Sequence, residues 1–448
     1  MVASFEIKIF EFFCKDAVKN LLFGSSKNGL TRHTIYLINF VSKQLTIMHK
    51  VSQPIDLTNR IHSLDLLRGF AVLGILIMNI TSFSQVSMAY MNPTIGAGLE
   101  GFNKYFHAFN FIFADTRFMS IFSILFGTGV VLFTQRIEAK GERVAALHYK
   151  RMFWLLLFGL IHAYFIWVGD ILVPYAICGS FVFFFRKKSI QTLFILTLIL
   201  FLIPISLNFI TYFGLPADEL ESTFAFFYPS AEEITYQTQT MRSSYFEQLP
   251  LRVKEAIGLQ TVVFMLELFW RASAMMLLGM ILYRKGVLSA EKSTGFYKNL
   301  MWLGFVPGLI LAGIGLNEAY ASNWNAGYVM NIGANFKTVS GLLMALGYIG
   351  LVIWCYKKGV LKKFQARLQA AGRMAFTNYI GMSVICTLIF NGHGLGLFGS
   401  FDRLQQFLVV ITVWILILII SPLVLNNYRF GPLEWLWRKL TYFSFTKH

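Results

Sequence analysis

The residues of this chain best suited to chemistry are ionisable side chains that interrupt long apolar segments. His162 stands within such a segment, eleven residues after Arg151, and Asp170 follows it by eight residues. A buried imidazole can accept and release protons, and a carboxylate can orient it, so this pair is a candidate for catalysis. Eight residues of straight helix separate two side chains by about 12 Å, so a direct contact requires a bend at Gly169 or an intervening water. A structural role for a histidine on an apolar helix is the alternative.

A second group of candidate functional residues lies at the start of the first apolar segment. Asp65 and Arg68 are three residues apart and therefore share one face of a helix. Arg68 could present its guanidinium to an anionic ligand while Asp65 holds it in place. Asn79 lies eleven residues further on, three turns along nearly the same face. The alternative is a helix-start acid beside an arginine that extends its charge to the membrane surface.

Charged residues on other apolar segments form a third group. Asp115 and Arg117 begin the second such segment, and Asp115 is a further candidate catalytic residue that could orient the imidazole. An acid at a helix start is also favoured by the helix dipole alone. Glu267 and Arg271 have the i,i+4 spacing of an intrahelical ion pair, which is compatible with a structural role. The candidates for substrate binding are Arg117, Glu267, Arg271 and Arg373, with Lys337, Asn378 and Tyr379 as weaker candidates at helix starts.

Helices that cross a membrane must position these residues. Of the 448 residues, 56% are hydrophobic and only 14% are charged, whereas soluble domains carry roughly 25% charged residues. The apolar runs reach the roughly 20 residues that cross a bilayer, and they do not alternate as the strands of a barrel would. We therefore predict an all-α polytopic membrane protein and exclude a soluble enzyme. The predicted helices span about 64–85, 112–135, 151–168, 170–186, 190–212, 257–283, 298–316, 335–356, 372–391 and 405–425.

Basic residues gather in alternate loops, most densely at 136–151, 186–188 and 357–367. The intervening loops carry few bases, and the one at about 213–256 is acidic. Because basic loops stay in the cytoplasm, both termini are expected there, with an even number of about ten helices. This distribution accounts for the net charge of +17 without a nucleic-acid partner.

The chain divides into a transmembrane domain at 48–448 and an N-terminal extension at 1–47. The extension is either an amphipathic helix at the membrane surface or sequence upstream of a true start at Met48. The four cysteines are scattered without metal-ligand spacing, and no nucleotide-binding or hydrolase motif is present. We therefore expect no metal and no nucleotide-driven transport.

Five motifs carry a resemblance to a known family: 63–69 (SLDLLRG), 122–127 (FSILFG), 159–172 (GLIHAYFIWVGDIL), 372–379 (GRMAFTNY) and 430–438 (FGPLEWLWR). With these motifs in order from about Arg60 to Tyr442, the chain resembles the YeiB-like family of bacterial multipass inner-membrane proteins, a domain-of-unknown-function family. The resemblance implies a multi-pass protein of the bacterial cytoplasmic membrane. It leaves residues 1–47 outside.

The first motif is also similar to the opening helix of a wider superfamily of transmembrane acyltransferases. That superfamily includes enzymes that O-acetylate surface polysaccharides and the lysosomal heparan glucosaminide N-acetyltransferase. In the O-acetylating branch a histidine follows the arginine near the end of the first helix. Asn79 occupies that place here, as an asparagine does in the glucosaminide-acetylating branch. The departure leaves His162, or His107 in the first outer loop, as the base.

This likeness implies transfer of an acyl group from cytoplasmic acyl-CoA, in the first instance acetyl-CoA, to a small-molecule or glycan acceptor at the outer face. Asp65, Arg68 and Asn79 would then bind the acyl-CoA. Some members of the YeiB-like family are labelled as transport proteins, so a secondary transporter of a small solute, coupled to protons through Asp65, His162 or Glu267, is the alternative. The paired, interrupted helices in two related halves that are typical of such transporters are not evident. The oligomeric state is left open.

Overall fold

Within residues 60–443, the part of the chain that the computed structural model describes, every regular element is a helix. The predicted all-α class is confirmed, while the extension predicted at 1–47 lies outside the described residues. Eight helical segments are long and apolar enough to cross a membrane, and a ninth counts if α16 (Lys362–Arg373) and α17 (Ala375–Phe390) form one bent span.

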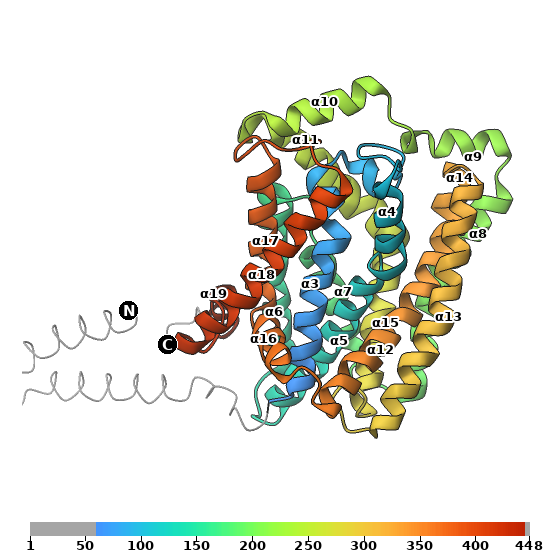
Figure 1. Cartoon of the computed structure of the whole chain (residues 1–448). Coiled ribbons are helices and arrows are strands. Elements are labelled where there is room, and N and C mark those ends of the chain that lie inside the picture. The colour runs from blue at the N-terminus through green and yellow to red at the C-terminus, as the bar shows by residue number, and fades with distance from the viewer. Residues whose placement is uncertain (1–59, 444–448) are drawn as a thin grey trace, which may run out of the picture. The chain divides into compact units, whose positions relative to one another are not determined.

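The eight candidate spans are built from fourteen helical elements, and several of the spans contain a break. They are α3 (His62–Ser84), α4 (Phe102–Phe113) with α5 (Arg117–Glu138), α6 (Val144–Ile161) with η3 (His162–Ile166), α8 (Ile190–Gly214), α11 (Tyr245–Gly258) with η6 (Leu259–Leu268) and α12 (Phe269–Arg284), α13 (Thr294–Ala321), α14 (Ala326–Tyr328) with η7 (Val329–Gly333) and α15 (Ala334–Lys358), and α18 (Arg403–Asn427). The most enclosed is α3, with 78% of its most apolar window buried inside the bundle against 22% for α18. Figure 1 accordingly shows α3 among the other helices of the bundle, so its polar residues can reach several neighbours.

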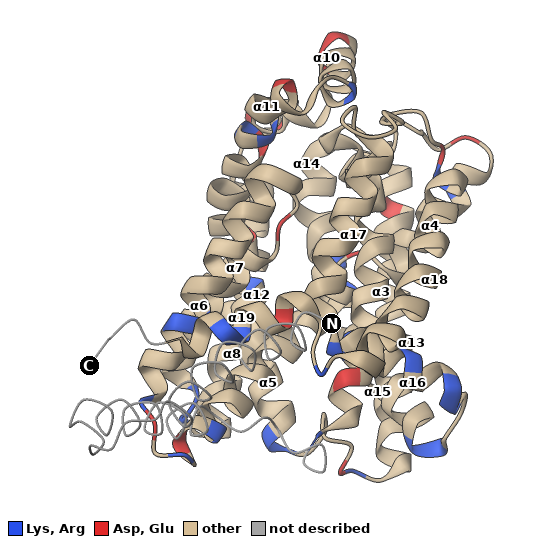
Figure 2. Ribbon diagram, turned by 90° about the vertical axis from the view of Figure 1, so that its left-hand side faces the viewer, with Lys and Arg blue, Asp and Glu red and all other residues tan. Residues whose placement is uncertain are grey.

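The loops alternate between the two ends of the bundle, as the charge pattern predicts. At one end, Lys187 pairs with Glu138 at 2.8 Å, and Arg284 donates a hydrogen bond to the Lys188 carbonyl at 2.6 Å. At the other end, Gln85 donates to the Phe401 carbonyl at 2.8 Å. Figure 2 shows many Lys and Arg residues around the first end, near α16, whereas acidic residues are prominent at the end that carries α10 (Ala231–Arg242) and α11. We call the first of these the basic end.

Residues 170–186, expected to form a full span, instead form the shorter helix α7 (Leu172–Val182) followed by η4 (Phe183–Phe185). These 11 and 3 residues cover about 21 Å, which is less than the hydrocarbon thickness of about 30 Å. The chain turns inside the bundle because η3 ends at Ile166 and Trp167 is extended, with φ −155° and ψ 132°. The full-length spans therefore number eight or nine among the described residues, against the ten expected.

The segment predicted as an outer loop at 213–256 is largely helical. It contains α9 (Ala217–Thr223) and α10, and α11 runs on without interruption into the following span, which therefore begins at residue 245 and not at 257. Figure 1 shows α10 lying across one end of the bundle. The segment thus covers the ends of the neighbouring helices.

The helices α3 and α16 cross with their backbones in contact. A Cβ atom on Gly372 would lie 1.8 Å from the Asp65 carbonyl oxygen, and one on Gly69 would lie 1.9 Å from the Leu368 carbonyl oxygen. Small residues at both positions permit this approach, which is the usual means of tight helix packing in membranes. The crossing fixes the position of Asp65 and Arg68 relative to α16.

The bend of 84° between α16 and α17 exposes the backbone at the start of α17. The carboxylate of Glu434, in α19 (Pro432–Tyr442), accepts hydrogen bonds from the N–H groups of Phe376 and Thr377 at 2.7 and 3.0 Å. These groups have no partner within their own helix, so Glu434 acts as a cap supplied by another helix. Asn378 donates to the Ala371 carbonyl at 3.0 Å across the same bend, which gives this predicted candidate a structural contact.

The position of the basic end in the cytoplasm remains a prediction and is testable with alkaline phosphatase, which is active only after export. A fusion after Gln239 in α10 is expected to be active and a fusion after Ser289 inactive, because the two positions lie at opposite ends of the bundle. Phosphatase activity normalised to fusion abundance is the measurement. The reverse pattern would invert the proposed orientation.

Candidate functional site

His162 and Asp170 form a buried pair near the middle of the bundle. His162 Nδ1 lies 2.8 Å from Asp170 Oδ1, and each side chain is only 1% exposed. A carboxylate beside Nδ1 holds the ring proton there, so Nε2 keeps its lone pair. That Nε2 is buried and has no hydrogen-bond partner among the described residues. The contact between His162 and Asp170, which a straight helix would not allow, is therefore direct.

The break between α6 and α7 produces this contact. The wider turns of η3 and the extended Trp167 bring the chain back toward His162. Asp170 Oδ2 then accepts the N–H of Val173 at 2.7 Å, at the positive end of α7, which keeps the carboxylate in place. Tyr379 of α17 secures the turn, because its hydroxyl accepts the N–H of Ile171 at 3.1 Å and its ring lies 5.1 Å from the imidazole.

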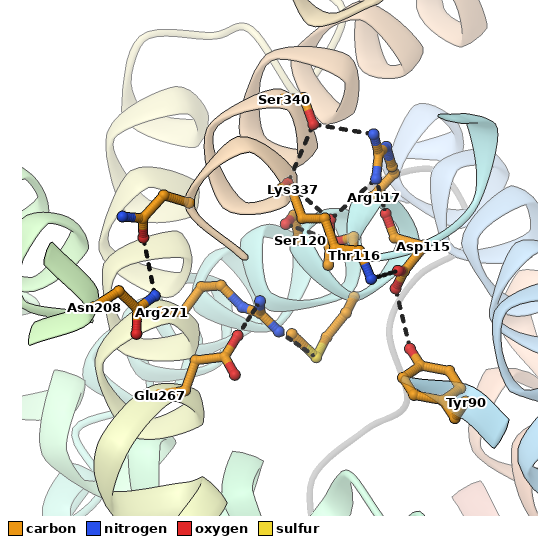
Figure 3. A network of polar contacts seen from close by, with 12 residues as sticks. Tyr90, Asp115, Thr116, Arg117, Ser120, Asn208, Glu267, Arg271, Lys337 and Ser340 are labelled. Atoms are coloured by element: carbon orange, nitrogen blue, oxygen red, sulfur yellow. Dashed lines mark hydrogen bonds and ion pairs between the residues drawn. The ribbon is translucent and has the colours of Figure 1, made fainter. Parts of the chain in front are cut away.

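A second polar cluster contains four of the other predicted site residues (Figure 3). Asp115 Oδ2 pairs with Lys337 Nζ at 2.9 Å, and Asp115 Oδ1 accepts the hydroxyl of Tyr90 at 3.1 Å. Arg117 donates to the backbone carbonyl of Asp115 and to Ser340 Oγ, the latter at 3.0 Å. Asp115 therefore contacts a lysine on another helix and not the imidazole that it was expected to orient.

The Glu267–Arg271 pair belongs to the same cluster in Figure 3. Arg271 Nη1 lies 2.5 Å from Glu267 Oε1, as the i,i+4 spacing predicts, and Arg271 Nη2 reaches Met119 Sδ at 3.7 Å. The arginine side chain is 8% exposed and the glutamate side chain 39% exposed. Glu267 is therefore partly exposed at the surface of the bundle, whereas Arg271 is buried.

Tyr175 connects α7, the helix that follows Asp170, with this cluster. It lies on α7, five residues after Asp170, and its hydroxyl lies 2.8 Å from Ser123 Oγ and donates to the Met119 carbonyl at 3.1 Å. The side chain of Met119 in turn contacts Arg271. Tyr175 of α7 and Met119 of α5 therefore connect the start of α7 with Arg271.

A group of cations occupies the basic end. Arg68 pairs with Asp65 at 3.2 Å, with the carboxylate side chain 3% exposed and the arginine side chain 30% exposed. Arg151 stacks over the Trp437 ring at 4.2 Å, and the charges of Arg68 and Arg438 lie within electrostatic range of it. We call Arg68, Arg151 and Arg438 the cation group.

The remaining predicted residues lie elsewhere. Asn79 is half-buried on α3, well removed from Arg68 along the helix. Arg373 donates to the Arg429 carbonyl at 3.3 Å, near the basic end and apart from Glu267. His107 lies against aromatic rings, the nearest being Trp324 at 5.1 Å.

The sequence analysis ranked Lys337 and Tyr379 only as weaker candidates. Lys337 could have been ranked higher, because a charged residue within an apolar span is a sign of function. Tyr90 was missed, because no pattern marks it. Arg151 and Arg438 were read only as topological markers.

A cavity of about 20 Å³ lies between the His162–Asp170 pair and the end of the bundle opposite the basic end. Its walls include Phe83, Trp167, Arg252 and Glu255. Such a volume admits about one water molecule. Trp167 stacks on Phe83 at 3.9 Å, and its ring lies 6.2 Å from that of His162. Trp167 therefore separates the cavity from the imidazole.

The helical bundle with its buried ionisable clusters defines a multipass membrane protein. Residues 282–444 match a family model described as Protein of unknown function (DUF418). The chain is 31% identical over 386 residues to the uncharacterized protein YeiB of Escherichia coli (strain K12), covering 85% of this chain and 95% of that protein. It is 33% identical over 422 residues to the uncharacterized protein YxaH of Bacillus subtilis (strain 168), covering 88% of this chain and 96% of that protein. The chain belongs to the DUF418 family, which confirms the YeiB-like resemblance.

The Asp115–Lys337 pair allows an asymmetric stability prediction. Asp115→Asn leaves the buried Arg117 and the half-buried Lys337 without their shared carboxylate and is expected to cost about 3–5 kcal/mol of unfolding free energy. Lys337→Met is expected to cost less, because Arg117 still compensates Asp115. The double variant should recover most of the loss from Asp115→Asn. Unfolding of the purified protein in detergent is the measurement, and a larger loss from Lys337→Met than from Asp115→Asn would contradict this account.

Proposed function

We propose that this protein is a transmembrane acyltransferase that moves an acyl group from acyl-CoA at the basic end to an acceptor that arrives from the opposite end. The observation that supports this most is the buried His162–Asp170 pair with its unpartnered Nε2. Carboxylate, imidazole and a free lone pair are the parts of a general base, which contributes about 10²–10⁴-fold to a rate.

The reaction follows from that lone pair. His162 Nε2 accepts the proton of an acceptor hydroxyl or amine as the acceptor oxygen or nitrogen attacks the thioester carbonyl. A C–O or C–N bond forms, the C–S bond breaks, and the CoA thiolate leaves and takes the proton from the imidazolium. Asp170 stabilises the imidazolium during the step and stays ionised.

The cation group supports acyl-CoA as donor. Guanidinium groups recognise phosphate well, and Arg68, Arg151 and Arg438 gather at the end expected to face the cytoplasm. Arg151 and His162 are eleven residues apart on one helix, which places them on nearly the same face and about 16 Å apart. The pantetheine arm of an acyl-CoA held by its phosphates at Arg151 would extend toward the base.

The cavity behind Trp167 supports an acceptor from the other side. Its walls carry both Arg252 and Glu255, which would offer hydrogen bonds to a small polar molecule or the end of a glycan once the cavity widens beyond its present room for about one water molecule. We place the protein in the bacterial cytoplasmic membrane with the basic end inside, and we take acetyl-CoA as the donor to test first. A movement of Trp167 would be needed for the acceptor to reach His162.

The test uses purified protein, radiolabelled acetyl-CoA and envelope fractions as acceptors. Wild-type protein is expected to transfer label, and His162→Ala to reduce the rate at least about 100-fold because the base is lost. Asp170→Asn should also reduce the rate, since the wrong imidazole tautomer is then favoured.

His107→Ala is the matched control, because His107 is the other histidine considered as the base and is half-buried against aromatic rings. It is expected to keep the wild-type rate. Wild-type protein that labels no acceptor, or His162→Ala that equals wild type, refutes the proposal.

The charged cluster of Figure 3 gives specific support to one other function, secondary transport of a small solute. Asp115, Glu267 and Lys337 are ionisable, partly exposed and within the bundle, which is where coupling residues of transporters lie. Uptake of solute by proteoliposomes without any acyl donor would favour transport. Acyl transfer by protein in detergent, where no gradient exists, would favour the enzyme.

A further inference from the structure

The cluster of Figure 3 has an unequal number of positive and negative groups. Its cations are Arg117, Arg271 and Lys337, and its anions are Asp115 and Glu267. Glu267 compensates Arg271, and Lys337 shares Asp115 with Arg117. The cluster therefore carries a net charge of +1 inside the bundle.

Arg117 is the cation without a carboxylate partner of its own. Its side chain is buried, with the residue 0% exposed. Among the described residues, its hydrogen bonds go to neutral acceptors, namely the Asp115 carbonyl, Thr116 Oγ1 and Ser340 Oγ. Its Nε is buried and lacks a partner among the described residues, as does the Nε of Arg271. An arginine keeps its proton at physiological pH, so the charge persists.

A buried charge without compensation is costly in a membrane protein, and such residues mark ligand pathways or sites. The backbone supplies a second sign of a built site. Thr116 adopts a left-handed conformation with φ 65°, which is uncommon for a residue with a side chain. This break ends α4 and aims the positive N-terminus of α5, which begins at Arg117, at the cluster.

Three members of the cluster are partly exposed at the surface of the bundle. The side chains of Lys337 and Asp115 are 19% and 14% exposed, and that of Glu267 is 39% exposed. Arg117 lies 21 residues before Glu138 at the basic end, and Lys337 lies 20 residues before Lys357, which bonds the Lys292 carbonyl there. Both spacings place the cluster about 30 Å from the basic end. A ligand would therefore reach it from the opposite side of the membrane.

We propose that Arg117 and Lys337 form a binding site for an oxyanion, a phosphate or carboxylate group, which brings the cluster to neutrality. This site is separate from the His162–Asp170 pair, and it holds whether the protein transfers acyl groups or transports solutes. The oxyanion is either part of a soluble molecule or the phosphate of a lipid headgroup in the outer leaflet.

The test measures thermal unfolding of the full-length purified protein in detergent during titration with sodium phosphate, with sodium chloride at equal ionic strength as reference. Phosphate is expected to raise the unfolding temperature of the wild-type protein, because a ligand that binds the folded state stabilises it. Arg117→Met should weaken the apparent phosphate affinity at least about tenfold, as expected for loss of a charged hydrogen-bond donor. Native mass spectrometry of the same sample detects any retained phospholipid.

A variant of opposite sign makes the test specific. Asp115→Asn removes the competing carboxylate and should tighten phosphate binding even though it destabilises the protein without phosphate. Lys140→Met, an exposed cation at the basic end, is the matched control and should leave the affinity unchanged. Should Arg117→Met fail to fold, Lys337→Met provides the same comparison.

The two sources give different outcomes. A soluble ligand predicts the phosphate response in protein free of phospholipid. A lipid ligand predicts a retained phospholipid in wild type that is lost in Arg117→Met. An Arg117→Met protein that matches wild type in both measurements, or a wild-type protein with neither response, would overturn the inference. These readouts involve no acyl donor, so they fail or succeed independently of acyl transfer.

Discussion

Charge inside a lipid bilayer must be compensated within the protein, and this constraint organises the functional part of the bundle. Lipid offers neither hydrogen bonds nor counterions, so each ionisable group either finds a partner on a helix or marks a place where a ligand or water enters. Asp170 meets His162, Asp115 meets Lys337, and Glu267 meets Arg271. Arg117 is buried without a carboxylate partner of its own, and the net positive charge that it leaves in its cluster is the basis of the oxyanion site.

The breaks in the helices also help to bring buried charges to their partners. Each of the polar clusters lies beside a π-helical or broken segment: η3 carries His162, η6 contains Glu267, and the α4–α5 break contains Asp115. A regular helix would direct these side chains at fixed angles and satisfy all its own backbone groups. The breaks redirect polar side chains into the bundle, and local π-helical turns are often found at functional sites. Chemistry and irregular backbone therefore coincide in this fold.

The sequence predicted those features that depend on local composition. Hydropathy located the helices, and the basic loops predicted which loops would share an end, because both signals are local. The sequence also predicted that a direct contact between His162 and Asp170 needs a bend, which it placed at Gly169, whereas η3 already ends at Ile166 and Trp167 is extended. The length of α7 could not be predicted, since apolar residues do not show how deep a turn lies. The contact between Asp115 and Lys337 was missed because it depends on the packing of two helices far apart in the chain.

The proposed acyl transfer requires the bundle to hold an acyl donor between the cation group and His162. The most direct measurement is mass spectrometry of small molecules released when the purified, folded protein is denatured. His162→Ala protein, which should bind the donor without using it, is expected to release acyl-CoA in amounts that approach one molecule per chain. Folded wild-type and His162→Ala proteins that both release none, even after incubation with acetyl-CoA, would contradict the account.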